Sequence, residues 1–392
     1  MVDRSLTHYL NSDFDLSLRP RPKQLGQPKL VRQVRELSVQ GILGASEADS
    51  VVVRAEVPAE FLEHLELCGA CVPTLLSHPQ IDPANRFRPF GWNADAEALN
   101  DQHRHPAEHP DLAVVRRVNS RSFAFELEEE IASDRPVGAV VEQREELESF
   151  LSRSSASSGW IIKAEHGHAG LANRRLEGAQ LSAADLRFVE DRLAEDDRLL
   201  VEPWLPRERD WCVVFDAPFD RGTLRVHETL CTADGALIGA LFEPERDAAM
   251  LGYDELGIMA ESVAARLGQE GYFGPVCVDA FTWHDADRSR LRAFVDLNCR
   301  LSMSDAAHRL WRRIAPERTF FYRFFNRRKL DLGTDLPIAL AALGPRRYDR
   351  RSRQGILLAS PLRLGKVAIA FVASGRPEVF ELERWFRERF ES

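Results

Sequence analysis

The sequence predicts an α/β (α+β) protein built from two or three lobes. Its 392 residues, of which 44% are hydrophobic, can bury a sizeable core and exceed the length of one average domain. Short apolar segments with strand character alternate with segments of helical periodicity along most of the chain. Length and alternation together predict several mixed units.

Composition narrows the class of ligand. The chain carries 52 basic and 61 acidic residues, a net charge of −9, which argues against the phosphate backbone of nucleic acid as the main partner. Six scattered cysteines do not form a disulfide framework, and no N-terminal basic segment leads into an apolar run of signal-peptide type. No apolar stretch approaches the roughly 20 residues that cross a bilayer. We therefore expect a cytoplasmic protein with small-molecule ligands and no membrane role.

The first two segments of the chain differ in character. Residues 1–28 are polar and contain the run Arg19-Pro20-Arg21-Pro22, which predicts an extended arm. Residues 29–117 predict a small α/β lobe, whose polar stretch from Phe87 to His109 resembles a linker to the next lobe. The elements expected in this lobe are helices over 30–43 and 59–67 and strands over 50–53 and 72–76.

Residues 118–200 predict a second lobe. Ser182 and Asp185 have the spacing of a capping box, which marks the start of a helix. The elements expected in this lobe are a helix from Ser120 past Glu130, a strand over 160–163, a helix over 182–194 and a strand over 199–205.

Residues 201–320 predict a third lobe, on which residues 321–392 are expected to pack as a C-terminal extension. Asp234 and Gly235 form a favoured turn pair and predict a hairpin. The elements expected in the third lobe are hairpin strands over 223–230 and 236–242, a helix over 253–269, and strands over 274–279 and 294–298.

A set of oxygen ligands lies on the last two of these strands. Asp296 and Asn298 are two residues apart, so they point to the same face of a strand. A polar turn links their strand to the one that ends at Asp279, so antiparallel pairing brings that carboxylate beside them. Two carboxylates and an amide oxygen suit Mg²⁺. The ordinary alternative is that acids at strand ends are simply solvated.

A lysine and a strand end predict contacts with a nucleotide. Lys163 ends an apolar strand just before Gly167 and Gly170, where backbone N–H groups can approach phosphates closely. Glu202 begins the segment Glu202-Pro203-Trp204-Leu205, which offers hinge backbone groups to an adenine edge. Each feature also has a plain alternative, namely an ordinary turn after the lysine and the end of strand pairing at the proline.

The order of these features resembles the ATP-grasp superfamily of carboxylate–amine ligase type. The resemblance extends from about Asn119 to Arg300. It implies that an N-terminal pre-ATP-grasp lobe precedes two subdomains, residues 118–200 and 201–320, that clamp ATP. It also implies an ATP-dependent, Mg²⁺-dependent ligase that forms an acyl phosphate and joins it to an amine, with two magnesium ions expected.

The resemblance assigns a role to each matching residue. Lys163 is the phosphate-binding lysine, and Gly167 and Gly170 belong to the loop over the triphosphate. The adenine amino group meets Glu202, and the ribose hydroxyls meet Asp210. The remaining assignments are Trp204 and Leu205 as hinge backbone contacts, Asp279, Asp296 and Asn298 as magnesium ligands, and Arg300 as the residue that stabilises the acyl phosphate or holds a substrate carboxylate.

The sequence departs from the family pattern at two positions. No lysine lies between Lys29 and Lys163, so Arg121 is the candidate for the usual early lysine, with a different geometry toward phosphate. Asp296 stands where a longer glutamate is commonest, which shortens its reach toward two metals. These departures leave a catalytically weak ATP-binding pseudoenzyme as an alternative function.

Three further features have competing interpretations. Cys68 and Cys71 have the spacing of a redox or zinc half-site, but no partner pair follows. His166 and His168 lie in the glycine loop, where phosphate contact or simple exposure is expected rather than metal binding. The arginine cluster of residues 346–353 supports a nucleic-acid or polyanion-binding module as another alternative. A homodimer and small-molecule carboxylate and amine substrates complete the expected partners.

Overall fold

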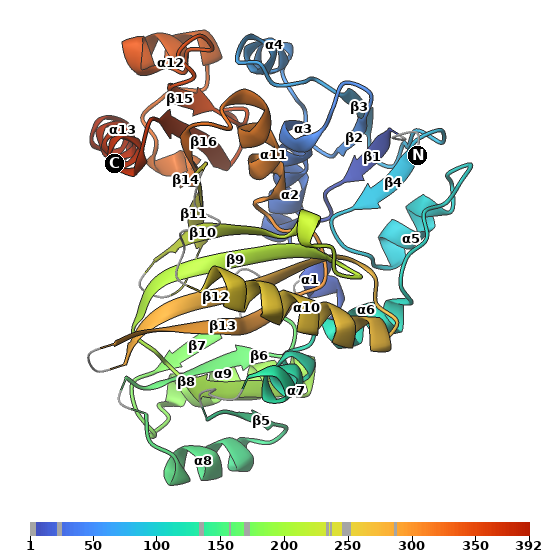
Figure 1. Ribbon diagram of the computed structural model, residues 1–392, viewed down its shortest axis with the longest axis vertical. Coiled ribbons are helices and arrows are strands. Elements are labelled where there is room, and N and C mark those ends of the chain that lie inside the picture. The colour runs from blue at the N-terminus through green and yellow to red at the C-terminus, as the bar shows by residue number, and fades with distance from the viewer. Residues whose placement is uncertain are drawn as a thin grey trace.

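The computed structural model describes residues 5–21, 26–132, 137–156, 158–167, 173–232, 235, 237–244, 252–285 and 288–392. Two four-stranded sheets and one eight-stranded sheet form the framework (Figure 1). The eight-stranded sheet runs through the middle of the molecule, with one small sheet at its side and the other facing its β12–β13 end. In the described residues, no helix is long and apolar enough to span a membrane.

The N-terminal sheet is parallel and corrects the expected arm. Its strands lie in the order β3 (Thr74–Ser77), β2 (Ser50–Val53), β1 (Leu6–Tyr9) and β4 (Arg86–Pro89). The arm expected over residues 1–28 is wrong for residues 5–21, because β1 pairs on both sides and Arg19 is buried. Arg19 Nη1 lies 3.0 Å from a Glu195 carboxylate oxygen. The stretch expected as a linker contributes β4 and helix α5 (Ala94–Asn100).

Short helices surround the N-terminal sheet. Hydrophobic side chains of α3 (Gly41–Gly44) and α4 (Ala59–Leu67) enter one large core with α11 (Asp305–Ile314). This core also contains the C-terminal strands, so the two ends of the chain are packed together. The other helices of this region are α1 (Phe14–Ser17), α2 (Pro28–Leu37) and α6 (Leu112–Val118).

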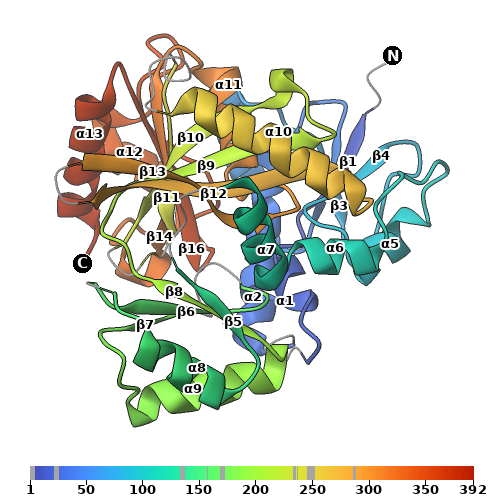
Figure 2. The same ribbon diagram turned by 60° about the horizontal axis from the view of Figure 1, so that its bottom comes forward.

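The second small sheet is antiparallel, with strand order β5 (Ala139–Val141), β8 (Leu199–Pro203), β6 (Trp160–Ala164) and β7 (Asn173–Leu176). Helices α8 (Arg144–Arg153) and α9 (Ala183–Asp196) lie together on one side of it, as Figure 2 shows. Leu147, Leu151 and Val189 from these helices pack on Trp160 and Ile162. The expected capping box at the start of α9 is confirmed, since the side chains of Ser182 and Asp185 bond each other's backbone N–H.

The eight-stranded sheet is antiparallel. One helix packs on its β13 end and another on its β16 end. Helix α10 (Tyr253–Gln269) packs on the face formed by β9, β12 and β13, and α13 (Arg376–Phe390) packs on β14 and β16. The expected hairpin is confirmed as β10 paired with β11. The strand order is β13 (Arg288–Asn298), β12 (Gly274–Asp285), β9 (Arg207–Ala217), β10 (Arg225–Cys231), β11 (Leu237–Phe242), β14 (Thr319–Asn326), β16 (Lys366–Ala373) and β15 (Gly355–Leu358).

Two expected lobe boundaries fall inside strands. The limit between residues 200 and 201 cuts β8, and the limit between residues 320 and 321 cuts β14. The chain leaves the small sheet only after Pro203, and the C-terminal residues add three strands to the large sheet instead of packing on it as a separate layer. Strand pairing across distant segments sets these limits, and local sequence patterns do not show it.

Candidate active site

A cavity of about 240 Å³ opens between the second small sheet and the β12–β13 end of the large sheet. Lys163 and Ile161 of β6 line it from one side, and acidic and aromatic side chains of the large sheet line it from the other. Residues of the N-terminal lobe close one end. The predicted site residues that line this cavity are Arg121, Lys163, Gly167, Trp204, Asp210, Asp279, Asp296, Asn298 and Arg300.

The predicted oxygen ligands share the floor of the cavity. Strands β12 and β13 pair antiparallel with Asp279 directly opposite Asp296, which confirms the expected register. Asn298 lies two residues beyond Asp296 and lines the same cavity. Burial raises the pKa of Asp279 to about 6, and the Cys212 side chain adds to this effect. The three oxygen groups therefore converge on one space in which a cation would stabilise the ionised acids.

Arginine 121 stands beside these acids. It begins helix α7 (Arg121–Ile131), and its guanidinium forms an ion pair with Asp296. Burial lowers the pKa of Arg121, while the nearby carboxylates, Asp279 first among them, oppose that effect. The position therefore brings a guanidinium group to the cavity beside the acids.

Arginine 300 makes four hydrogen bonds within the protein and also lines the cavity. Its guanidinium donates to both carboxylate oxygens of Asp15, at 2.7 and 3.1 Å, and to Asn298 Oδ1 at 2.9 Å. It also donates to the Leu301 carbonyl at 3.0 Å and stacks on the Phe90 ring at 4.8 Å. These contacts connect the N-terminal lobe to the end of β13 and hold Asn298 in place.

On the β6 side of the cavity, Lys163 belongs to a buried ion-pair network. Its ammonium group pairs with Glu202, whose other oxygen accepts from Arg292 at 2.9 Å. Arg292 also forms a two-bond pair with Glu128, at 2.7 and 2.8 Å. Burial lowers the pKa of Lys163 to about 8. Burial alone would raise the pKa of Glu202, but Arg292 and Lys163 hold it well below its ordinary value.

The segment after Glu202 forms the hinge between the two sheets. Trp204 lines the cavity, and the guanidinium groups of Arg175 and Arg207 lie over its ring at 4.8 and 5.2 Å from the centroid. Arg207 also stacks on Phe281 at 4.6 Å and donates to Asp210 at 3.0 Å. The side chains of Glu202 and Leu205 are not among the residues that line the cavity.

Sequence reasoning missed several of these residues. Phe281 lies two residues after Asp279 on β12, so strand alternation places it on the same face and could have marked it as a candidate. Arg292 carries no comparable local signal, because its partners Glu202 and Glu128 come from β8 and α7. Burial raises the pKa of Asp210, so its carboxylate is held by Arg207 rather than by solvent.

The glycine loop is described only in part. Gly167 lines the cavity, and a Cβ atom there would lie 2.8 Å from Arg121 Nη2, so the position accepts only a residue without a side chain unless the arginine moves. Gly170 and His168 lie outside the described residues. His166 is buried, and burial lowers its pKa to about 4.

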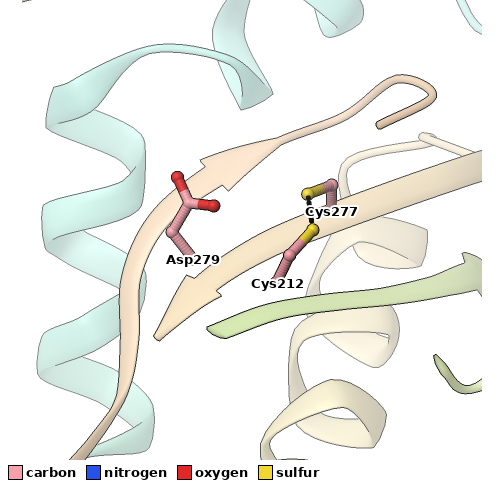
Figure 3. A group of neighbouring side chains, drawn as sticks. All are labelled: Cys212, Cys277 and Asp279. Atoms are coloured by element: carbon pink, nitrogen blue, oxygen red, sulfur yellow. Dashed lines mark hydrogen bonds between the residues drawn. The ribbon is translucent and has the colours of Figure 1, made fainter. Parts of the chain in front are cut away.

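Two cysteines that sequence reasoning passed over lie on the same floor. Cys212 Sγ is 3.0 Å from Cys277 Sγ, and both side chains line the cavity next to Asp279 (Figure 3). By contrast, Cys68 lies in the core at the end of α4 and hydrogen-bonds His64 Nδ1 at 3.8 Å. All the cysteines are free thiols.

Comparison with known proteins gives structural matches without sequence matches. No protein-family model matches the chain, and no curated protein matches its sequence significantly. Three solved structures superpose over nearly the whole chain. N5-carboxyaminoimidazole synthetase from Staphylococcus aureus, complexed with ADP, has a TM-score of 0.54 and 10% identity, covering 99% of this chain and 97% of that one.

The other two solved structures resemble this chain to a similar degree. Biotin carboxylase from Campylobacter jejuni, in a complex with β-γ-ATP, has a TM-score of 0.56 and 12% identity, covering 99% of this chain and 91% of that one. Phosphoribosylamine–glycine ligase from Thermotoga maritima has a TM-score of 0.54 and 10% identity, covering 98% and 97%. Likeness at this level over both whole chains shows a shared fold.

Proposed function

The chain has the ATP-grasp fold, and from this premise we propose that it is a magnesium-dependent ligase that uses ATP to activate a carboxylate for attack by an amine. One observation carries the proposal. Asp279 and Asp296 face each other across two strands, beside Asn298, in the cavity that also holds Lys163 and Arg121. Structural neighbours in complexes with ADP and β-γ-ATP support a nucleotide as the ligand.

The donor chemistry of the floor fits magnesium. Asp279, Asp296 and Asn298 supply oxygen ligands only, as a hard cation with a partial water shell requires. When bound there, Mg²⁺ would neutralise charge on the β- and γ-phosphates. Arg121 already forms an ion pair with Asp296. It can therefore keep that carboxylate oriented and also contact the phosphates.

Lys163 and Glu202 would change partners when the nucleotide binds. Lys163 lines the cavity while it pairs with Glu202, so a triphosphate can attract its ammonium group away from that carboxylate. Glu202 remains paired with Arg292. The oxygen that Lys163 leaves is then free to accept a hydrogen bond from the adenine amino group. Asp210 would hold the ribose hydroxyls, and backbone groups of Trp204 and Leu205 would meet the adenine edge.

The proposed reaction has two steps. An oxygen of the substrate carboxylate attacks the γ-phosphorus, which forms an acyl phosphate and releases ADP. The amine then attacks the acyl carbon, phosphate leaves, and the amine proton passes to solvent. Arg121 and Lys163 offset the charge that develops on the phosphate in the first step. Arg300 positions Asn298 and pairs with Asp15, and because it lines the cavity it can also stabilise the acyl phosphate or hold the substrate carboxylate.

One observation favours a second candidate, a nucleotide-binding protein with weak catalysis. The Arg121–Asp296 ion pair competes with metal for a carboxylate that is already shorter than the family's usual glutamate. The nucleic-acid alternative has less support, because two arginines of the 346–353 cluster already have partners within the protein. Arg346 stacks on Trp385 at 4.4 Å, and Arg353 pairs with Glu317 at 2.9 Å.

ADP release separates the ligase from these alternatives. Purified protein with MgATP should release ADP and phosphate when a panel of carboxylates and amines contains the substrates, and the Lys163→Ala variant should not. Nucleotide binding without turnover in a single-turnover experiment with every pair would favour the weak catalyst. Salt-sensitive retention on RNA with no nucleotide binding would contradict the ligase.

A further inference from the structure

We propose that Cys212, Cys277 and Asp279 form a second cation site on the cavity floor, one that takes a thiophilic divalent ion such as Zn²⁺ or Co²⁺. The proposal goes beyond the ligase function, because sulfur ligands play no part in magnesium binding. In the described part of the chain, these are the only three His, Cys, Asp or Glu side chains with ligand atoms this close together.

Strand register brings the three side chains together. Strand β12 pairs antiparallel with β9, and Asp279 lies directly opposite Cys212. Cys277 is two residues before Asp279 on β12, so the two project from the same face of the sheet. Figure 3 shows the cysteine side chains meeting between the two strands with Asp279 farther along β12.

The distances suit a tetrahedral centre after a small adjustment. One ligand atom from each residue lies within 4.8 Å of the others, and the two sulfurs are 3.0 Å apart. With Zn–S bonds near 2.3 Å, two sulfurs on a tetrahedral ion sit about 3.8 Å apart, so the thiols would separate by roughly 0.8 Å. Cavity space beside Asp279 leaves the fourth position to water.

The surroundings can orient one of the sulfurs. Ser302 Oγ lies 3.5 Å from Cys212 Sγ and 2.7 Å from Ser304 Oγ, which in turn lies 2.7 Å from His227 Nε2. All four side chains are buried. Such outer hydrogen bonds fix the orientation of metal ligands and adjust their affinity.

Binding of the ion has defined chemical consequences. Both thiols must lose their protons, so one bound ion releases two protons to solvent and no electrons are transferred. If the proposed function holds, the ion also takes Asp279 from the magnesium set, and it should inhibit turnover until a chelator removes it. With an added oxidant such as diamide, which takes up the two electrons and two protons, the same cysteines can instead form a disulfide, so the metal test uses reduced protein.

Cobalt titration of the full-length, reduced and metal-free protein tests the site without nucleotide or substrate. Co²⁺ should produce a thiolate-to-cobalt charge-transfer band that saturates at one ion per chain, and Zn²⁺ should abolish it. Cys212→Ser and Cys277→Ser should each weaken Co²⁺ binding at least about tenfold, because each removes a soft ligand. The matched control is Cys231→Ser, a thiol that lines the same cavity from β10 and should leave the band unchanged.

Three results would overturn the site. They are a parent protein without the band, a band that survives in the Cys212→Ser, Cys277→Ser double variant, and equal loss in Cys231→Ser. Circular dichroism of each variant separates loss of ligands from loss of fold. Asp279→Asn gives a second check, since it should weaken Co²⁺ binding but keep the sulfur band. Because no step uses ATP, failure of the ligase proposal leaves this test intact.

Discussion

Two groups of charged side chains beside the cavity, called here the hinge end and the strand end, are arranged in contrasting ways. At the hinge end, the network of Lys163, Glu202, Arg292 and Glu128 has two cations and two carboxylates, each paired within the protein. At the strand end, Asp279 has no hydrogen-bond partner in the described residues, and burial raises its pKa to about 6. A balanced cluster needs no ligand, whereas an unbalanced one gains stability from a cation.

This contrast distinguishes charged residues that hold the fold together from charged residues that can contact a ligand. Arg292 and Glu128 are both buried and lie outside the cavity lining, so their pairing connects β13 to α7 rather than touching a ligand. Lys163 and Asp279 line the cavity, and each faces a charge that a ligand would change. We therefore expect variants of Arg292 and Glu128 to affect mainly folding, and variants of Lys163 and of the acids on β12 and β13 to affect mainly nucleotide and metal binding.

The largest expected effect follows from removal of Arg292. Arg292→Met leaves Glu128 without its two-bond partner and Glu202 with Lys163 alone, both in a buried setting. Breaking a buried ion pair in this way should lower the free energy of unfolding by about 3–5 kcal/mol, as measured by urea denaturation. The control is Arg353→Met, whose half-exposed pair with Glu317 should contribute less than about 1 kcal/mol. An equal decrease in the free energy of unfolding in the two variants would mean that the buried network contributes no more to stability than an exposed ion pair.

Removal of Lys163 should affect nucleotide binding next most strongly. A charge-assisted hydrogen bond to phosphate contributes about 1.5–3 kcal/mol, so Lys163→Ala should weaken MgATP binding about 10- to 100-fold, as measured by calorimetry. Lys329→Ala, an exposed lysine far along the chain, is the matched control and should bind like the parent. Unchanged affinity in Lys163→Ala would remove the basis for placing the triphosphate beside β6.

Arg121 tests the charge at the strand end. Arg121→Lys should keep much of the MgATP affinity, since the ammonium group preserves charge, and Arg121→Ala should lose about tenfold. Arg117, which pairs with Glu270 at 2.8 Å, does not line the cavity, so Arg117→Ala is a suitable control. If Arg121→Ala binds and turns over ATP like the parent, Arg121 does not replace the early lysine, and another residue such as Arg116 fills the role or none does.

Local sequence patterns were enough to predict which residues meet when those residues come from one hairpin. The register of Asp279, Asp296 and Asn298 followed from alternation and one turn, and the structure confirms it. The order of elements from Lys163 onward predicted the fold, which comparison with solved structures also shows. In these cases the sequence separation is short, so the turn determines which residues meet.

Distant pairing explains what the sequence did not reveal. Strand β1 has only four residues, and its partners β2 and β4 begin more than 40 residues away, so Leu6–Tyr9 carries no strand signal of its own. Arg292 meets Glu128 across 164 positions. The cysteine pair depends on the register of β9 with β12, which is set by packing rather than by either strand alone. Such contacts become visible only once the sheets are assembled.

The smallest expected effect concerns pH at the strand end. Burial raises the pKa of Asp279 from 3.8 to about 6, so the metal-free fold binds more protons than the unfolded chain in that window, and its stability falls as pH rises through it. Mg²⁺ requires the ionised carboxylate, so its apparent affinity should fall about tenfold for each pH unit below about 6. Fluorescence or calorimetric titration of Mg²⁺ in the presence of ADP measures this dependence.

Two variants distinguish the acids. Asp296→Asn should raise the Mg²⁺ concentration needed at every pH but keep the break near pH 6, because Asp279 still titrates. Asp279→Asn should weaken binding and remove the break, since no ionisable ligand with a raised pKa remains at that position. A break that persists in Asp279→Asn would assign the proton to another group and contradict the proposed magnesium set. The sheet geometry favours Asp279, because it is the carboxylate that faces both the magnesium ligands and the cysteine pair.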